Sequence, residues 1–238
     1  MKVDILAFGA HPDDVELGCG GTVSKEVKLG KIVGIIDLTR GELGTRGTVE
    51  IRNTESERAK EILGVVFREN LDMRDGFFRN DEVHQLKVIE KLRKYRPDIV
   101  LCNAIEDRHI DHGKGSELVS DACFLSGLRK IVTYENGVEQ EAWRPKVVYH
   151  YLQWKNLTPD FVVDISNEIE NKQNAILAYR SQFYNENSNE PETPISSKNF
   201  LESITYRDRD LGRLVGIEYA EGFIAERCLA VNELSDLK

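Results

Sequence analysis

The chain has 238 residues, of which 40% are hydrophobic and 31% charged, the composition of a globular protein rather than a disordered or fibrous one. Its formal net charge of −9 disfavours general attraction to nucleic-acid phosphates or anionic lipid. No window of the sequence approaches the roughly 18 consecutive apolar residues that a membrane-spanning helix requires. We therefore predict neither a nucleic-acid partner nor insertion into a membrane.

Cysteine spacing and the N-terminal segment indicate the compartment. The four cysteines lie far apart and form no Cys-x-x-Cys motif, which favours a reducing environment. The first apolar run ends at His11, too early for a secretory signal, and is predicted as a strand instead. We expect a cytoplasmic protein.

Short apolar runs alternate with segments of helical spacing along the first two thirds of the chain. The runs predict strands at Val3–Phe8, Lys31–Leu38, Asp98–Cys102 and Lys146–Leu152. The spaced segments predict helices at Gly21–Leu29, Thr54–Leu63, Asp81–Tyr95 and Gly115–Leu128. This alternation predicts an α/β fold with a Rossmann-like, mostly parallel sheet and helices on both faces.

The last third of the chain has a different pattern. It predicts a polar-rich helix at Ser166–Phe183, a loop at Asn185–Ser197, a helix at Asn199–Leu214 and a short strand at Tyr219–Ile224. The loop, a candidate lid or oligomer contact, is too short and too central for a domain linker. We predict one domain over residues 1–238, with the last third added to the sheet.

Two motifs follow predicted strands. Ala-His-Pro-Asp-Asp occupies residues 10–14, and Glu-Asp-Arg-His-Ile-Asp-His occupies residues 106–112. In open parallel sheets, ligands bind at the carboxyl ends of strands. His11, Asp14 and His112 would supply the three N or O ligands of a catalytic zinc ion that keeps a position open for water.

Three more residues of the motifs suit catalytic roles. Asp13, beside the ion, is a candidate general base. His109, one turn before the ligand His112, would donate to a developing oxyanion, with Asp111 orienting its ring. Alternatively, the aspartates are a helix cap and the histidines surface loop residues, but the occurrence of both motifs at strand ends of one sheet favours a site.

Two histidines and a glycine cluster are assigned structural roles. His84 lies in an amphipathic helix and His150 in an apolar strand, which favours packing roles. Gly18-x-Gly20-Gly21 weakly matches a dinucleotide-binding loop, but upstream aspartates would repel a pyrophosphate. We predict that these glycines allow close packing of a helix on the sheet.

Further motif residues lie between the two segments. Residues 39–47 have the sequence Thr-Arg-Gly-Glu-Leu-Gly-Thr-Arg-Gly, followed by Arg52 and Glu57. Together with residues 10–14 and 109–112, they closely resemble the LmbE-like, or PIG-L-type, zinc-dependent N-acetylglucosaminide deacetylases. The resemblance covers most of residues 3–153 and is greatest to the bacterial deacetylases of bacillithiol biosynthesis, which remove acetate from an N-acetylglucosamine–malate conjugate.

The resemblance implies one zinc ion per chain on His11, Asp14 and His112. It also implies that Asp13 is the base and that His109 assists the oxyanion, with Asp111 behind it. The partner would be a small-molecule N-acetylglucosaminide. Members of the family are often homo-oligomers, so a trimer or hexamer is expected.

Three arginines in or near the motifs are candidate substrate contacts: Arg52, Arg108 and Arg144. Each has an alternative structural role, as an ion-pair partner, an exposed residue or a rim residue respectively. Some relatives carry an active-site tyrosine, but Tyr184 and Tyr206 lie where the resemblance is weaker. A tyrosine contribution is therefore left open.

Other functions remain possible at this point. The substrate could be another N-acetylglucosamine derivative, such as an N-acetylchitooligosaccharide. Two histidines and one carboxylate are also the ligand set of non-haem iron oxygenases. A non-catalytic metal- or sugar-binding protein is a further alternative, although a free carboxylate such as Asp13 has no use beside a purely structural ion.

Overall fold

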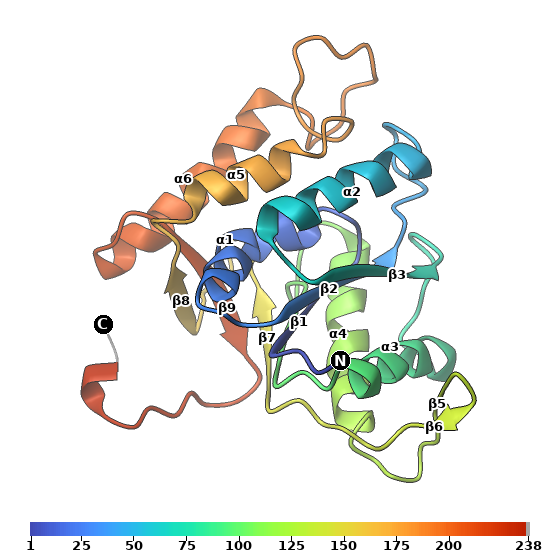
Figure 1. Ribbon diagram of the computed structural model, residues 1–238. Coiled ribbons are helices and arrows are strands. Elements are labelled where there is room, and N and C mark those ends of the chain that lie inside the picture. Colours follow the sequence, from blue (N-terminus) through green and yellow to red (C-terminus); the bar gives the residue numbers. More distant parts are fainter. Residues whose placement is uncertain (237–238) are drawn as a thin grey trace.

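Seven strands form one sheet in the order β3-β2-β1-β4-β7-β9-β8 in the computed structural model, which describes residues 1–236 (Figure 1). The strands are β1 (Ile5–Gly9), β2 (Val33–Thr39), β3 (Phe67–Met73), β4 (Ile99–Cys102), β7 (Val147–Tyr151), β8 (Phe161–Asp164) and β9 (Ala220–Ala225). The five strands from β3 to β7 in this order pair in parallel, whereas β9 is antiparallel to both of its neighbours. The predicted α/β class with a mostly parallel sheet is confirmed.

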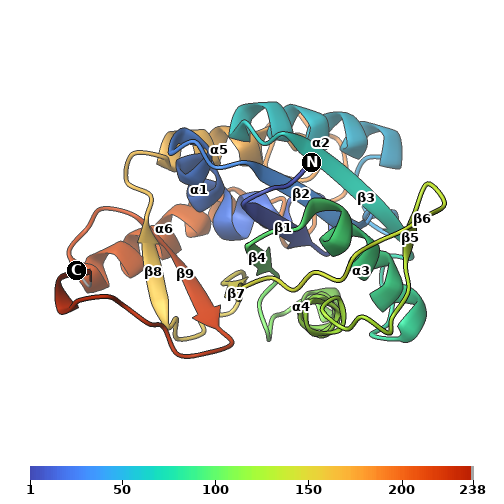
Figure 2. The same ribbon diagram turned by 60° about the horizontal axis from the view of Figure 1, so that its bottom comes forward.

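Helices cover both faces of the sheet (Figure 2). One face carries α1 (Asp14–Lys28), α2 (Val49–Leu63) and α5 (Ile169–Leu177), and the other carries α3 (Glu82–Tyr95) and α4 (Ile110–Leu125). Helix α6 (Lys198–Val215) packs against β9 and β8. A hairpin, β5 (Tyr134–Glu135) and β6 (Val138–Glu139), and the short 3-10 helix η1 (Leu234–Asp236) lie outside the sheet. Within residues 1–236, no helix is long and apolar enough to cross a membrane.

The central strands are buried on both faces, which explains their continuous apolar runs. In β1, Ile5 and Ala7 belong to the core beneath α1, while Leu6 and Phe8 belong to the core beneath α3 and α4. Successive side chains of a strand point to opposite faces, so one short segment contributes to two cores.

The glycine cluster lies inside α1 rather than in a turn before it. A Cβ atom on Gly18 would lie 2.1 Å from Cδ2 of Tyr151, and one on Gly21 would lie 2.8 Å from Cδ1 of Ile165. Both distances are too short for a side chain, so the glycines let α1 approach the sheet closely. The prediction of close packing is confirmed, and the helix bends at Cys19, whose φ is −146°.

Element boundaries differ from the predictions in two systematic ways. Helices α1, α2 and α4 begin at Asp14, Val49 and Ile110, five to seven residues before their predicted starts. Polar residues stand between the apolar residues of their first turns, which interrupts the helical spacing of the apolar residues. Strands β3 and β8 were not predicted, since both are edge strands without a long apolar run. The helix predicted over Ser166–Phe183 is shorter, with α5 covering Ile169–Leu177.

Candidate active site

A cavity of about 410 Å³ lies at the carboxyl ends of β1, β4 and β7, a volume suited to a small ligand. Both sequence motifs contribute to it, and residues 193–195 with part of α6 close one side. The polar residues that line the cavity include His11, Asp13, Asp14, Arg52, Asp75, Asp107, Arg108, His109, His112 and Gln153.

His11 and His112 each have a carboxylate behind one ring nitrogen. Nε2 of His11 lies 3.1 Å from Oδ1 of Asp75, and Nδ1 of His112 lies 2.5 Å from Oδ2 of Asp107. Each of these carboxylates can accept a hydrogen bond from the ring nitrogen that faces it, and a neutral ring that donates there has its lone pair on the opposite nitrogen. The opposite nitrogens face Asp14: Nδ1 of His11 at 3.5 Å and Nε2 of His112 at 3.1 Å. A carboxylate behind each histidine is the usual arrangement around a bound metal ion.

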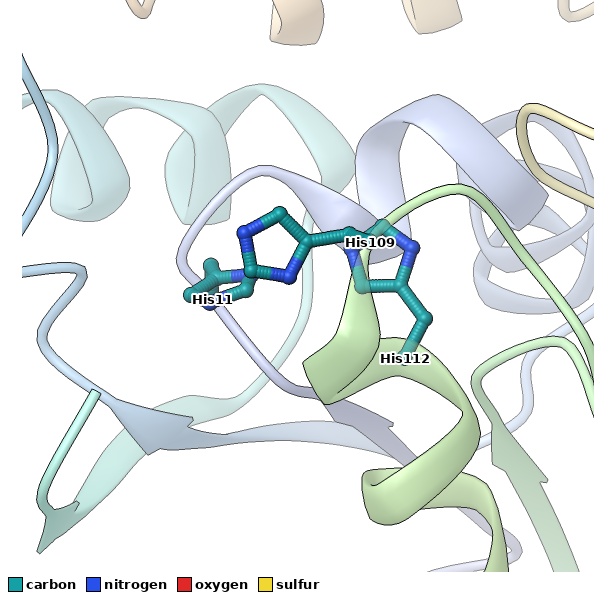
Figure 3. Close-up of side chains that lie close together, drawn as sticks. All are labelled: His11, His109 and His112. Carbon is teal, nitrogen blue, oxygen red and sulfur yellow. The ribbon is translucent and has the colours of Figure 1, made fainter. Parts of the chain in front are cut away.

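His109 brings a third imidazole to the same place. The rings of His11, His109 and His112 lie together at the N-terminus of α4 (Figure 3), and their nitrogens are close enough to hold an ion. However, Nδ1 of His109 accepts a hydrogen bond from the Asp111 backbone N–H at 3.2 Å. The neutral ring therefore carries its hydrogen on Nε2 and acts as a donor there rather than as a ligand. Among the described residues, the groups whose ligand atoms all lie within 4.8 Å of one another are His11 with His109 and His112, and His11 with Asp75 and Asp111. The predicted ligand Asp14 lies between His11 and His112, 3.5 Å and 3.1 Å from their ring nitrogens.

Asp13 is buried beside Asp14 and is not a helix cap. It occupies the N-cap position of α1, yet within residues 1–236 its side chain makes no capping hydrogen bond. Oδ2 instead accepts a hydrogen bond of 2.7 Å from Nη2 of Arg52. Its φ of 125° is rare for a non-glycine residue, and such strain is common at functional sites. Burial raises the pKa of Asp13 and the Arg52 charge lowers it, leaving a pKa of about 7.

Asp111 contacts a different histidine from the one expected. Its carboxylate accepts hydrogen bonds from the backbone N–H of Gly76 at 2.6 Å and from Nζ of Lys114 at 3.1 Å, and Oδ2 lies 3.5 Å from Nε2 of His11. Only its backbone N–H contacts the His109 ring among the described contacts. The prediction that the carboxylate orients His109 is corrected: helix geometry points this side chain toward His11.

The three candidate arginines have three different environments. Arg52 lines the cavity but donates to the Pro12 carbonyl and the Asp13 carboxylate. Arg108 also lines the cavity, with its guanidinium 4.6 Å from the centre of the Trp154 ring. Within residues 1–236, Arg108 forms no ion pair, so its charge is free to meet a ligand.

Arg144 lies away from the cavity, before the start of β7. Its guanidinium stacks on Phe124 at 4.3 Å and donates to the Phe124 carbonyl at 2.8 Å. Since the site is at the opposite end of the strands, the predicted substrate contact is corrected. Arg144 packs against the C-terminal part of α4.

Several polar residues of the site were not predicted. Asp75 follows the unpredicted strand β3, and Asp107 was part of the second motif without an assigned role. Asn103 and Gln153 follow β4 and β7, and both are buried. Their positions directly after strands of the sheet were the available signal. The cavity walls include no tyrosine within residues 1–236.

His150 has a buried hydrogen-bonding environment. Nδ1 lies 2.8 Å from the Ser116 hydroxyl and 3.1 Å from the Asn103 carbonyl, and Nε2 lies 3.0 Å from Oε1 of Glu226. Burial lowers the pKa of His150, but Cys102, Glu226 and the Asn103 carbonyl raise it above its ordinary value. The packing role expected for His150 agrees with these contacts.

We expect His150→Ala to lower the free energy of unfolding by about 2–4 kcal/mol, because it leaves a cavity and unpaired polar groups. A raised pKa in the folded state gives stability that is complete below about pH 6.5 and is lost as the pH rises through the raised pKa. The deficit in urea unfolding should therefore be larger at pH 6 than at pH 9. His84→Ala, which alters a partly exposed ring in α3, is the control and should change stability by less than about 1 kcal/mol.

Comparisons with known proteins show the family of the chain. A family model described as PIG-L, GlcNAc-PI de-N-acetylase, matches residues 6–123. Diacetylchitobiose deacetylase of Thermococcus kodakarensis is 31% identical over 189 residues, which are 75% of this chain and 70% of that protein. The chain belongs to the PIG-L deacetylase family.

Solved structures of similar proteins extend the likeness over nearly the whole chain. A conserved protein of Thermus thermophilus superposes with a TM-score of 0.85 at 38% identity, covering 97% of this chain and 98% of that one. The N,N'-diacetylchitobiose deacetylase of Pyrococcus horikoshii superposes with a TM-score of 0.78 at 25% identity, covering 98% and 88%. The C-terminal third of this PIG-L chain therefore also follows the fold of its relatives.

Proposed function

We propose that this PIG-L chain is a zinc-dependent hydrolase that removes acetate from an N-acetylglucosaminide. The observation that carries the proposal is the pair of imidazole nitrogens, on His11 and His112, that face Asp14 while carboxylates hold the opposite nitrogens. Two imidazoles and one carboxylate are a common protein ligand set of catalytic zinc. Membership of a deacetylase family favours hydrolysis over the iron-oxygenase and non-catalytic alternatives.

His11, Asp14 and His112 would hold one zinc ion per chain. When bound, zinc supplies Lewis-acid activation of water and of a carbonyl oxygen. Asp13 is buried next to Asp14, faces the cavity and is held by Arg52, so its carboxylate is positioned to accept a proton from water. Its pKa of about 7 suits a group that both accepts and donates a proton near neutral pH.

The chain's own residues account for the proton transfers of amide hydrolysis. Asp13 takes one proton from water as the water oxygen attacks the acetyl carbonyl carbon. The Nε2–H of His109 donates a hydrogen bond to the resulting oxyanion. Burial lowers the pKa of His109 below its ordinary value, which keeps this ring a neutral donor. Protonated Asp13 then gives its proton to the amine nitrogen as the C–N bond breaks, releasing acetate and the amino sugar.

For the substrate, we propose the N-acetylglucosamine–malate conjugate of bacillithiol biosynthesis. A malate aglycone carries two carboxylates, which a chain of net charge −9 repels unless a local cation binds them. Arg108 provides such a cation on the cavity wall, stacked on Trp154. A guanidinium is well suited to pairing with carboxylates.

We expect Arg108→Met to reduce the preference for the malate conjugate over free N-acetylglucosamine by about 1.5–3 kcal/mol in kcat/KM, the range for hydrogen bonds to charged groups. The assay measures acetate release from both sugars at two salt concentrations, because long-range attraction is screened whereas a close pair persists. Arg144→Met is the matched control, since Arg144 also stacks on an aromatic ring but lies outside the cavity. Equal efficiency of the wild type on both sugars would contradict the malate assignment.

An N-acetylchitooligosaccharide is the second candidate substrate, because two of the similar proteins are named as diacetylchitobiose deacetylases. Including N,N'-diacetylchitobiose in the same panel decides between them. A higher kcat/KM on this neutral disaccharide, unaffected by Arg108→Met, would favour the second candidate. The deacetylase chemistry would be unchanged.

A further inference from the structure

Two buried carboxamides converge on the Asp14 carboxylate. Nε2 of Gln153 donates to Oδ1 of Asp14 at 2.9 Å, and Nδ2 of Asn103 donates to Oδ2 at 3.0 Å. The backbone N–H of His11 also donates to Oδ2, at 2.9 Å. Asn103, Gln153 and Asp14 are each at least 95% buried, so water does not compete for these contacts.

The two carboxamides also fix each other. Nδ2 of Asn103 donates to Oε1 of Gln153 at 2.9 Å, and Oδ1 of Asn103 accepts from the backbone N–H of Ala10 at 2.9 Å. Oε1 of Gln153 accepts a second hydrogen bond from the backbone N–H of Ala104 at 3.4 Å. Because Asp14 can only accept and Ala10 N–H can only donate, the amide orientations are determined by the network.

The network joins three strands at the edge of the sheet where the site lies. Asp14 follows β1, Asn103 directly follows β4, and Gln153 follows β7, which pairs with β4. The backbone carbonyl of Gln153 is in turn bonded by Arg207 of α6. The carboxylate is therefore held by elements far apart in the sequence as well as by its own loop.

We infer that Asn103 and Gln153 are positioning residues that orient the Asp14 carboxylate for a bound cation, an inference that rests on the metal site of the proposed function. Nε2 of His112 and Nε2 of Gln153 both face Oδ1 of Asp14. When the His112 nitrogen binds the metal ion instead, Gln153 is the side chain among the described residues that still donates a hydrogen bond to Oδ1. Without the two amides, the buried Asp14 carboxylate loses its fixed orientation and two uncharged hydrogen-bond donors. The carboxylate then has to be oriented when the metal ion binds, which weakens binding. Outer partners of this kind commonly change metal affinity by about 10–100-fold.

The test is a zinc titration of the metal-free full chain in competition with a chromophoric chelator. We expect Gln153→Met and Asn103→Leu each to weaken zinc binding by about 10–100-fold. The double variant should lose less than the product of the two single losses, because both residues act on one carboxylate and on each other. At saturating zinc, the KM of Asn103→Leu for substrate should stay within about twofold of wild type, because Asn103 is not among the residues that line the cavity.

Asn171→Leu is the control for loss of a hydrogen-bonded amide, at a half-buried position. Its side chain bonds to the Ser24 hydroxyl and the Ile62 carbonyl, away from the cavity, so zinc affinity should be unchanged even if stability falls. If Gln153→Met does not fold, Gln153→Asn decides the question, because its shorter amide stays polar but does not reach Asp14.

Zinc affinities within twofold of wild type in folded single variants would overturn the inference. Failure of the proposed function looks different: the wild type would bind one zinc ion and release no acetate from any N-acetylglucosaminide. A wild-type chain that binds no zinc would overturn both.

Discussion

Asp13→Asn is expected to lower kcat by about 10²–10⁴-fold while leaving the bound metal in place, the usual range for a general acid–base residue. Asparagine is nearly isosteric and its oxygen can still accept the hydrogen bond from Arg52, so the loop geometry should persist. The amide, however, cannot take a proton from water or return one to the leaving amine. The measurements are kcat for acetate release and zinc content of the same sample.

Asp14→Asn is the control for Asp13→Asn, because the two aspartates are adjacent and both buried. We expect Asp14→Asn to lose zinc and activity together, whereas Asp13→Asn loses activity alone. If Asp13→Asn released zinc as completely as Asp14→Asn, the roles of base and ligand would have to be exchanged.

Replacing His11, Asp14 or His112 with alanine should remove most of the bound zinc and abolish detectable turnover. Each change leaves two protein ligands, and affinity falls steeply when a ligand is lost from a three-ligand site. Replacing His11 also removes the imidazole partner of Asp75, and replacing His112 removes that of Asp107. Each change leaves a carboxylate in the site without its imidazole partner, which is destabilising. Metal content after dialysis, measured per chain by elemental analysis, checks the expectation.

His109→Ala separates the two possible sets of ligands. The three imidazoles are close enough to hold an ion, but the hydrogen bond from Asp111 N–H to Nδ1 makes His109 a donor. We therefore expect His109→Ala to retain zinc and to slow turnover by about 10²–10³-fold, the loss typical of one oxyanion donor. Loss of zinc from His109→Ala with retention in Asp14→Ala would favour the three-histidine set.

The sequence was sufficient to propose His11, Asp14 and His112 as metal ligands because each motif is local. His11 and Asp14 lie three positions apart directly after a strongly apolar strand, and His112 lies in the first turn of α4, the helix that follows β4. Parallel pairing of β1 with β4 then brings these ends together. The carboxylate Asp75 was missed because it follows β3, an edge strand whose sequence contains Arg68, Glu69 and Asn70 and shows no apolar run.

By itself, the sequence determined the parallel sheet, the two motif-bearing strand ends and the role of the α1 glycines, because apolar periodicity and chain proximity are local properties. The tertiary structure decided which side chains meet. It placed Asp75 and Asp107 behind the two histidines, turned Asp111 toward His11 and left Arg144 at the far end of β7. Side-chain direction depends on where helices begin, and α1 and α4 begin within the motifs, where polar residues hide the helical pattern. Asp75, for example, reaches Nε2 of His11 from beyond β3, and this contact forms across the fold rather than along the chain.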